Sequence, residues 1–226
     1  MSWVRLPAPH GRSDRNRLDP GLSQGALRNA RSVGLAPTEG IPYIAAMSWI
    51  DQHPDMAGAF GAIAEAKSVD QKAFREAMSR LGAAVHVITT DGPAGKTGFT
   101  ATAVVSVSDA PPTLLVCLNR NATSTPVLRS NGVLCVNTLR AGDEIIADTF
   151  AGRTKVAREA RFDAGEWKTL STGSPALMSA VVAFDCRVSE IKAVASHDIY
   201  FGIVEAIHQG GPGAALVYHD RLYKQV

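Results

Sequence analysis

Small and hydroxyl-bearing side chains alternate over residues 98–108, a segment that otherwise has the composition of a β-strand. Residues 98–103 are Gly-Phe-Thr-Ala-Thr-Ala, where a core strand normally has bulky apolar side chains. The twofold period of a strand puts Thr100 and Thr102 on one face and the aromatic and alanine side chains on the other. A strand with such small side chains leaves room for a flat ring. The hydroxyls and backbone N–H groups of the strand can then bind the polar edge of that ring. The alternative is an edge strand in which threonine serves only its β-propensity.

A second polar group lies at residues 119–126, Asn-Arg-Asn-Ala-Thr-Ser-Thr-Pro. Pro126 suits the first position of a helix, and Thr125 before it is a good N-cap. The free N–H groups of a helix start attract anions, and Arg120 and three hydroxyls stand nearby. The pattern therefore fits the phosphate site of a nucleotide cofactor, and it fits simple helix capping equally well.

His197 is the histidine with the clearest chemical possibility. It is followed by Asp198 at a predicted bend between two strands. A histidine at the mouth of a strand can hydrogen-bond a substrate or the carboxamide of a nicotinamide. A His–Asp pair that stabilises the turn is the alternative. The remaining histidines have no metal-ligand spacing, so no metal site is predicted.

Several motifs are absent or incomplete. Residues 92–97 end in Gly-Lys-Thr like a phosphate-binding loop, but Thr90 stands where that loop needs its first glycine. A β-hairpin turn is the better interpretation. The sequence contains neither a Gly-x-Ser-x-Gly elbow nor a GxGxxG fingerprint. Hydrolase chemistry and a Rossmann domain therefore have no support.

The elements that must position these residues are mostly strands. Segments rich in Val, Ile, Thr and aromatic residues, separated by Gly, Pro, Asp or Asn, occur at 84–90, 99–108, 113–119, 132–139, 181–195, 199–207 and 215–223. Helices are predicted at 126–130 and 143–150, and a further helix between a capping box at Ser68 and Gln71 and a stop at Gly82. Residues 151–176 look irregular. Because strands follow strands, we expect a mainly β fold, one antiparallel barrel with a few peripheral helices.

Composition narrows the class of protein further. The net charge of +2 over 226 residues favours neither nucleic acid nor a membrane as partner. Residues 1–67 are rich in Gly, Pro, Ser, Ala and Arg and have no sustained period, so we expect a flexible or poorly ordered extension before a domain at 68–226. The three cysteines lie in apolar strand-like runs, which predicts reduced thiols and a cytoplasmic location.

From Phe74 to its C-terminus the chain resembles the flavin reductase-like family, whose members adopt an FMN-binding split β-barrel with Greek-key topology. The resemblance rests on 98–108 with Pro111-Pro112 after it, on Asn119-Arg120 with Ser124, on Cys-Val-Asn-Thr-Leu at 135–139, on Phe-Ala-Gly at 150–152, and on His-Asp-Ile-Tyr-Phe-Gly at 197–202. Within the family it is most similar to the NADH-dependent FMN reductases that serve pyrimidine utilisation.

The resemblance implies bound FMN, NADH (or NADPH) as hydride donor, and a homodimer whose two barrels both shape each site. It implies that the isoalloxazine is lined by Thr100, Ala101, Thr102 and Ala103. The ribityl chain and phosphate would be held by Ser106, Asn119, Arg120, Ser124 and Thr125. Phe150, Ala151 and Gly152 would close around the cofactor, and His197 would face the nicotinamide. Ala103 departs from the family pattern, because it offers no hydroxyl.

The implied activity is an NAD(P)H:FMN oxidoreductase that delivers reduced FMN to a flavin-dependent monooxygenase, here in pyrimidine or uracil degradation. The reductase component of an aromatic hydroxylase system is an alternative with the same hydride step. A non-catalytic FMN-binding electron carrier is another. A split-barrel oxidase of a phosphorylated vitamin would require a second phosphate clamp, which the sequence does not show.

Overall fold

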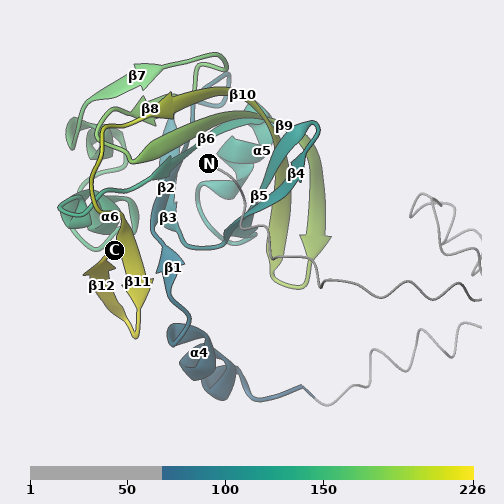
Figure 1. Cartoon of the computed structure of the whole chain (residues 1–226). Helices are drawn as coiled ribbons and strands as arrows, with labels where there is room; N and C mark the ends of the chain where they lie inside the picture. The colour runs from purple at the N-terminus through teal and green to yellow at the C-terminus, as the bar shows by residue number, and fades with distance from the viewer. Residues whose placement is uncertain (1–67) are drawn as a thin grey trace, which may run out of the picture. The chain divides into compact units, whose positions relative to one another are not determined.

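Seven antiparallel strands form the main sheet of the computed structural model, which describes residues 68–226 (Figure 1). Their order is β3-β2-β6-β9-β10-β5-β4. The strands are β2 (His86–Thr90), β3 (Thr97–Ala101), β4 (Val104–Asp109), β5 (Pro112–Asn119), β6 (Val133–Thr138), β9 (Val182–Val194) and β10 (His197–Gln209). The extension expected at 1–67 lies outside the described residues.

The sheet is curled, because its two edge strands are consecutive in the chain. β3 and β4 lie at opposite edges, although only Thr102 and Ala103 separate them. The backbone N–H of Cys117, in β5, donates to the carbonyl oxygen of Ala103 over 3.1 Å and fixes this connection. The single strand predicted over 99–108 is therefore wrong, since the chain leaves one edge at Thr102 and joins the other edge at Val104. The mainly β, split-barrel class is confirmed.

Apolar residues cover both faces of the curled sheet. Along β2, Ile88 packs with Leu134 and Tyr200 in a cluster on the inner face. Its neighbour Val87 belongs to a second cluster, which also contains residues of α6 (Glu144–Phe150). Successive strand residues point to opposite faces, so β2 needs a helix on its outer side and receives α6 there.

The α-helices within residues 68–226 confirm two of the predicted helices and shift the start and the end of a third. α5 (Thr125–Asn131) and α6 confirm the two predicted short helices. In α4 (Gln71–Ser79) the N-cap is Asp70, not Ser68, and its carboxylate accepts the backbone N–H groups of Lys72 (2.8 Å) and Ala73 (3.1 Å). This places the carboxylate on the N2 and N3 donors, which Ser68 is too far upstream to reach. The helix also ends before Gly82, with Arg80 as C-cap.

The C-terminal segment is a hairpin rather than the single strand predicted at 215–223. β11 (Leu216–His219) and β12 (Leu222–Gln225) are joined by Asp220 and Arg221, whose φ angles are 52° and 60°. With β1 (Ala83–Ala84) they form a small three-stranded sheet in the order β1-β11-β12 (Figure 1). The segment predicted to be irregular contains a further small hairpin and a 3-10 turn. These are η2 (Glu159–Asp163), β7 (Trp167–Thr169) and β8 (Pro175–Leu177). Three-residue strands are too short for alternation to reveal them.

Candidate functional site

The connection between β3 and β4, residues 100–104, is named here the bend. Thr100 is tied to α6, because its hydroxyl donates to the carbonyl oxygen of Ala147 over 2.6 Å. The expected division of faces is confirmed within β3: Thr100 points toward α6, whereas Phe99 and Ala101 pack against the inner cluster. Thr102 and Ala103 lie beyond the end of the strand. The Thr102 side chain is exposed, and it makes no hydrogen bond to any residue of 68–226.

Two hollows meet at the bend, and both are lined by Thr102 and Tyr218. The smaller has a volume of about 200 Å³. The larger has a volume of about 750 Å³. The smaller is lined by Thr100, Ala101, Thr102 and Ala151 together with Val85, Arg153, Tyr218 and Tyr223. The larger adds Ala103, Val104, Val105 and His86 to residues of α4 and β1. The structure thus brings the four residues expected to line a ring together with Ala151.

Two tyrosines of the C-terminal hairpin form a wall that sequence reasoning missed. Tyr218 and Tyr223 pair across the hairpin, with ring centroids 5.5 Å apart. The Tyr223 hydroxyl donates to Oδ1 of Asp148 over 2.8 Å, and Arg153 donates to the same oxygen over 2.9 Å. Burial, and then the neighbouring Asp148, raise the pKa of Tyr223 to about 12, so its hydroxyl stays protonated at neutral pH. The sequence signal for this hairpin was the pair of turn residues Asp220 and Arg221 between two short apolar runs.

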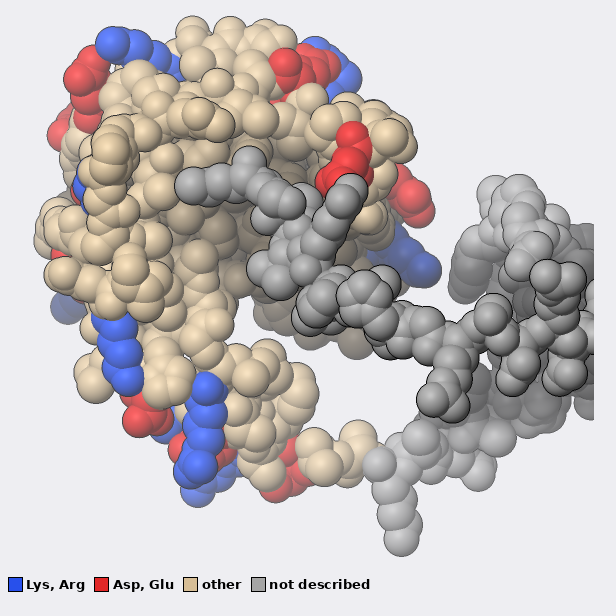
Figure 2. Space-filling model, in the orientation of Figure 1, with Lys and Arg blue, Asp and Glu red and all other residues tan. Residues whose placement is uncertain are grey.

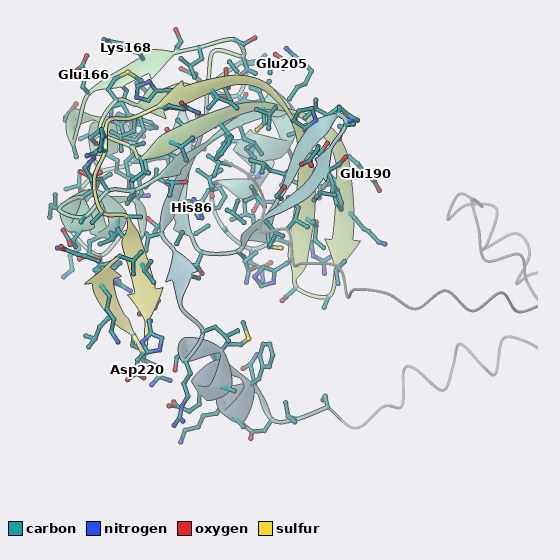
Figure 3. The ribbon with its side chains drawn as sticks, in the orientation of Figure 1. His86, Glu166, Lys168, Glu190, Glu205 and Asp220 are labelled. Carbon is teal, nitrogen blue, oxygen red and sulfur yellow. The ribbon has the colours of Figure 1, made fainter. Side chains whose placement is uncertain are left out.

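His86 is a buried histidine on the wall of the larger hollow. It begins β2 and is 8% exposed, and its Nδ1 lies 3.0 Å from the hydroxyl of Thr138. Burial lowers the pKa of His86 to about 4, so the ring is neutral at pH 7. Figure 3 shows the side chain on β2, on the side that faces the interior of the barrel.

The expected phosphate residues lie elsewhere, at the meeting point of β5, α5 and the β9–β10 turn. This region, residues 119–125 and 195–198, is named here the corner. The Thr125 hydroxyl donates to the carbonyl oxygen of Asn119 over 2.7 Å, and the Asn119 side chain accepts the backbone N–H of Asn121. Arg120 donates to the carbonyl oxygen of Ala195. These polar groups therefore already have partners within the protein.

The start of α5 differs from the predicted capping arrangement. The helix begins at Thr125 with Ser124 at the cap position, and the Ser124 side chain makes no capping bond. The backbone N–H of Thr125 donates to the carbonyl oxygen of Ala122 over 3.0 Å. The expectation that Thr125 is the N-cap is wrong, because this preceding turn already closes onto its N–H group.

His197 and Asp198 do not pair with each other. His197 is exposed, opposite Asn119 in the ladder, and its Nδ1 lies 2.9 Å from the hydroxyl of Ser196. Asp198 is fully buried and receives Arg129 of α5 at 2.5 Å. Consecutive strand residues face opposite ways, so the alternative of a turn-stabilising His–Asp pair is wrong. His197 stays available to a ligand at the surface.

The other expected residues occupy mixed positions. Phe150 is buried, with its ring 5.1 Å from Phe162 and 5.5 Å from Trp167, so it supports the site from within the core. Gly152 takes a left-handed conformation with φ of 76° immediately after the hollow-lining Ala151. Ser106 is exposed on β4 and lines neither of the two hollows. Its contact with a cofactor stays a prediction.

Residues 68–226 contain no group of three His, Cys, Asp or Glu side chains that could hold a metal ion. Their cysteines are free, and burial raises the pKa of Cys186 to about 12 and that of Cys135 further. These two sulfurs are therefore protonated thiols rather than nucleophiles. In the same range no helix is long and apolar enough to cross a bilayer. On the face in Figure 2, most of the acidic and basic side chains that can be seen lie around the rim, with both charges interspersed.

Comparison with known proteins agrees with this geometry. Residues 78–226 match the model of the flavin reductase like domain. The chain is 56% identical over 161 residues to the FMN reductase (NADH) RutF 1 of Methylorubrum extorquens, covering 71% of this chain and 79% of that protein. A crystal structure from Haemophilus somnus, of a protein assigned as a flavin reductase, superposes with a TM-score of 0.67 at 46% identity over 70% of this chain and all of the other.

A second solved structure is BorF, the flavin reductase component of a bacterial two-component tryptophan halogenase. It has a TM-score of 0.65 and 27% identity, and the superposition covers 70% of this chain and 98% of that one. The family model spans well over half of the chain, and the superpositions show that these neighbours share its fold. This chain belongs to the flavin reductase-like family.

Proposed function

We propose that this flavin reductase oxidises NADH, reduces FMN, and releases the reduced FMN to a flavin-dependent oxygenase that acts in pyrimidine degradation. The observation that carries the proposal is the junction of two hollows at the bend, in a chain of this family. Hydride transfer requires two flat rings to lie against each other. Two hollows that meet at Thr102 and Tyr218 suit that requirement.

The residues at the bend fit a flavin. The larger hollow, at about 750 Å³, lies within the usual range of 300 to about 1,000 Å³ for ligand sites. Its walls are mainly apolar. The polar groups include the Thr102 hydroxyl, the backbone of Ala103 and the His86 imidazole, and the other polar side chains of the lining are Arg75, Ser79, Tyr218 and Arg221. A ring system with apolar faces and a polar edge matches this set. The smaller hollow has room for a single ring but not for a whole dinucleotide.

When bound, FMN supplies the electron-accepting chemistry, and the protein supplies binding and alignment. We assign Thr100, Ala101, Thr102 and Ala103 to the ring, with the hydroxyl of Thr102 facing it. Ser106, Asn119, Arg120 and Ser124 are assigned to the ribityl chain and phosphate. Thr125 is assigned to the same region through its place at the start of α5, because its hydroxyl and N–H groups already bond to Asn119 and Ala122. Phe150, Ala151 and Gly152 enclose the cofactor, and the exposed His197 positions the nicotinamide. No protein general acid is needed for the transfer.

We infer that the active form is a homodimer. The apolar side chains of α4 and of the residues directly after it are uncovered: Phe74 is 54% exposed and Met78 46%, and Leu81, just past the helix, is 59% exposed. α4 has nine residues and buries none of them, and a helix this short is marginal without tertiary packing. Met78 and Leu81 also line the larger hollow, so a second copy seated on this face would complete the site.

The assignment of an oxygenase partner follows the relatives. The similar protein of Methylorubrum extorquens is named RutF, and BorF serves a two-component halogenase. An aromatic hydroxylase would use the same reductase chemistry and differ only in the partner. The cysteines are free and two of them are buried, which agrees with the reducing environment of the cytoplasm, where we place the protein.

Turnover tests the proposal directly. Purified protein is titrated with FMN by fluorescence quenching, and NADH oxidation is then followed with a large excess of free FMN. We expect micromolar or tighter FMN binding and many NADH molecules oxidised per protein chain. Oxidation that stops after one equivalent identifies an electron carrier. Failure to bind FMN at micromolar concentrations overturns the proposal. The same assay with NADPH determines the preferred donor.

A further inference from the structure

We propose that His86 binds the polar edge of the flavin ring through its Nε2 atom, in the larger hollow at the bend. This inference rests on the proposed function, because it requires FMN as the ligand. It assigns a ring-binding role to a residue that the family motifs above do not include.

The position of His86 in the sheet directs its side chain toward the hollow. In the ladder His86 lies between Ala101 of β3 and Thr138 of β6. It shares a strand face with Ile88, which packs in the inner cluster, so the imidazole also points into the barrel. Because it is the first residue of β2, it stands at the end of this face, where it lines the same hollow as Thr102 and Ala103. The small neighbour Ala101 leaves the space open.

One nitrogen of the ring is held and the other is open. Nδ1 lies 3.0 Å from the Thr138 hydroxyl, which fixes the plane of the imidazole. Among residues 68–226, Nε2 has no hydrogen-bond partner. Nε2 is not among the fully buried side-chain atoms that lack a partner, so it is accessible from the hollow and can bond to a ligand with a polar edge. A core role alone would be served better by the Val and Ile that follow in β2.

The chemistry of the pair suits a flavin edge in either tautomer. If Thr138 donates to Nδ1, then Nε2 carries the proton and can donate to a ring carbonyl or ring nitrogen. If Thr138 accepts, then Nε2 can accept from the imide N–H of the ring. Both groups are on the pyrimidine edge of an isoalloxazine. The imidazole stays neutral, so it would bind the flavin through a hydrogen bond and not through a charge.

The other polar residues around the hollow are less suited to this role. Arg75 bonds to Gln71 within α4, and Arg221 pairs with Glu76 at 2.6 Å. Both arginine side chains are exposed, at the rim. Tyr218 packs against Tyr223 on the wall shared with the smaller hollow. His86 is therefore the buried polar side chain at the base of the larger hollow.

Substitution of His86 tests the assignment in the absence of NADH. Equilibrium titrations with FMN and with riboflavin, and the visible absorption band of the bound flavin, are compared for wild type, His86→Leu and His86→Asn. The matched control is His208→Leu, since the Nε2 atom of His208 lies 3.2 Å from the carbonyl oxygen of Met178, outside the hollow. We expect His86→Leu to weaken both flavins by roughly three- to tenfold and to shift the absorption band. His86→Asn should lose less affinity, and the control none.

The outcomes separate this inference from the proposed function. If wild type binds no FMN, the proposed function fails. If wild type binds FMN and His86→Leu binds both flavins within twofold of wild type with an unchanged absorption band, the role of His86 is overturned. Thermal melting of the flavin-free proteins checks folding. Should the leucine variant melt earlier than wild type, the asparagine variant decides, because it keeps a hydrogen-bonding group: a loss of flavin affinity as large as that of the leucine variant overturns the assignment.

Discussion

The bend and the corner both contain residues expected to hold a flavin, but the polar side chains of the two regions differ in whether they already have hydrogen-bond partners within the protein. At the bend, side chains are small, two hollows meet, and the Thr102 hydroxyl and the His86 Nε2 have no partner among residues 68–226. At the corner, Arg120, Asn119 and Thr125 bond to other parts of the chain. A ligand gains new hydrogen bonds at the bend, whereas at the corner it must replace existing ones.

Residue type alone does not reveal this difference between the two regions. The sequence offers hydroxyls, a guanidinium and a helix start, which are the groups of an anion site. The fold uses the N–H of Thr125 for a bond to Ala122 and the N–H of Arg120 for a bond to Ser196. The same donors that recognise phosphate also build turns, and only the structure shows which use is in place.

The largest effect is expected from a substitution that fills the bend. In Thr102→Trp the indole occupies the junction of both hollows, so FMN binding should fall at least a hundredfold, or about 2.7 kcal/mol. The side chain is exposed, so the melting temperature of the flavin-free protein should change little. FMN titration and thermal melting measure the two effects.

The control for this substitution is Thr169→Trp, at an exposed position on β7. It adds the same bulk away from the bend and should bind FMN like wild type. Equal affinity in Thr102→Trp and wild type would mean that the ring lies elsewhere, and the contrast between bend and corner would then lose its functional meaning.

The next effect concerns stability against pH at the bend. His86 has a folded-state pKa of about 4 against an ordinary value of 6.5, because it is buried. Below pH 6.5 the His86 imidazole of the unfolded chain binds a proton, whereas in the native protein the imidazole stays neutral until about pH 4. The free energy of unfolding should therefore decrease as the pH is lowered, by about 2.5 kcal/mol from this residue between pH 7 and 4.5.

Urea denaturation at pH 7, 5.5 and 4.5 measures this loss for wild type and His86→Leu. Carboxylates also titrate in this range, so the quantity of interest is the difference between the two proteins. The wild-type value should decline more steeply than that of the variant. Parallel curves would show that the imidazole is not desolvated, and that the bend does not hold a costly polar group.

The sequence was sufficient for most of the fold, for physical reasons that the failures also clarify. Runs of β-branched residues between turn residues located the long strands, since strand pairing and burial act on those side chains. The break at Thr102 was missed because nothing in an alternating segment marks the change from one sheet edge to the other. The site was partly visible, as Thr100 to Ala103 and Ala151. Tyr218 and His86 were not, because their role depends on neighbours supplied by distant strands.

A smaller effect is expected from Arg120, and it tests whether the corner holds a phosphate at all. Arg120→Gln removes the charge, so FMN affinity should fall about tenfold while riboflavin, which lacks the phosphate, binds as before. The comparison is made by titrating both flavins. Arg187→Gln is the control, because Arg187 is exposed and pairs with Glu205 on the far part of the sheet. Equal losses for both flavins would assign Arg120 to holding the Ala195 turn instead.

The smallest effect is expected at Thr125, where the two uses of a hydroxyl can be separated. Its single proton is donated to Asn119, and its N–H is donated to Ala122, so neither is left for a phosphate oxygen, which can only accept. Thr125→Val should lower the free energy of unfolding by about 1 kcal/mol and change FMN affinity by less than twofold, while Thr125→Ser should restore stability. Urea denaturation and FMN titration of the two variants measure these quantities. A large loss of FMN affinity in the valine variant, without a matching loss for riboflavin, would show that the hydroxyl abandons Asn119 when the cofactor binds. The corner would then be a site that opens its own hydrogen bonds, and the distinction from the bend would be one of degree.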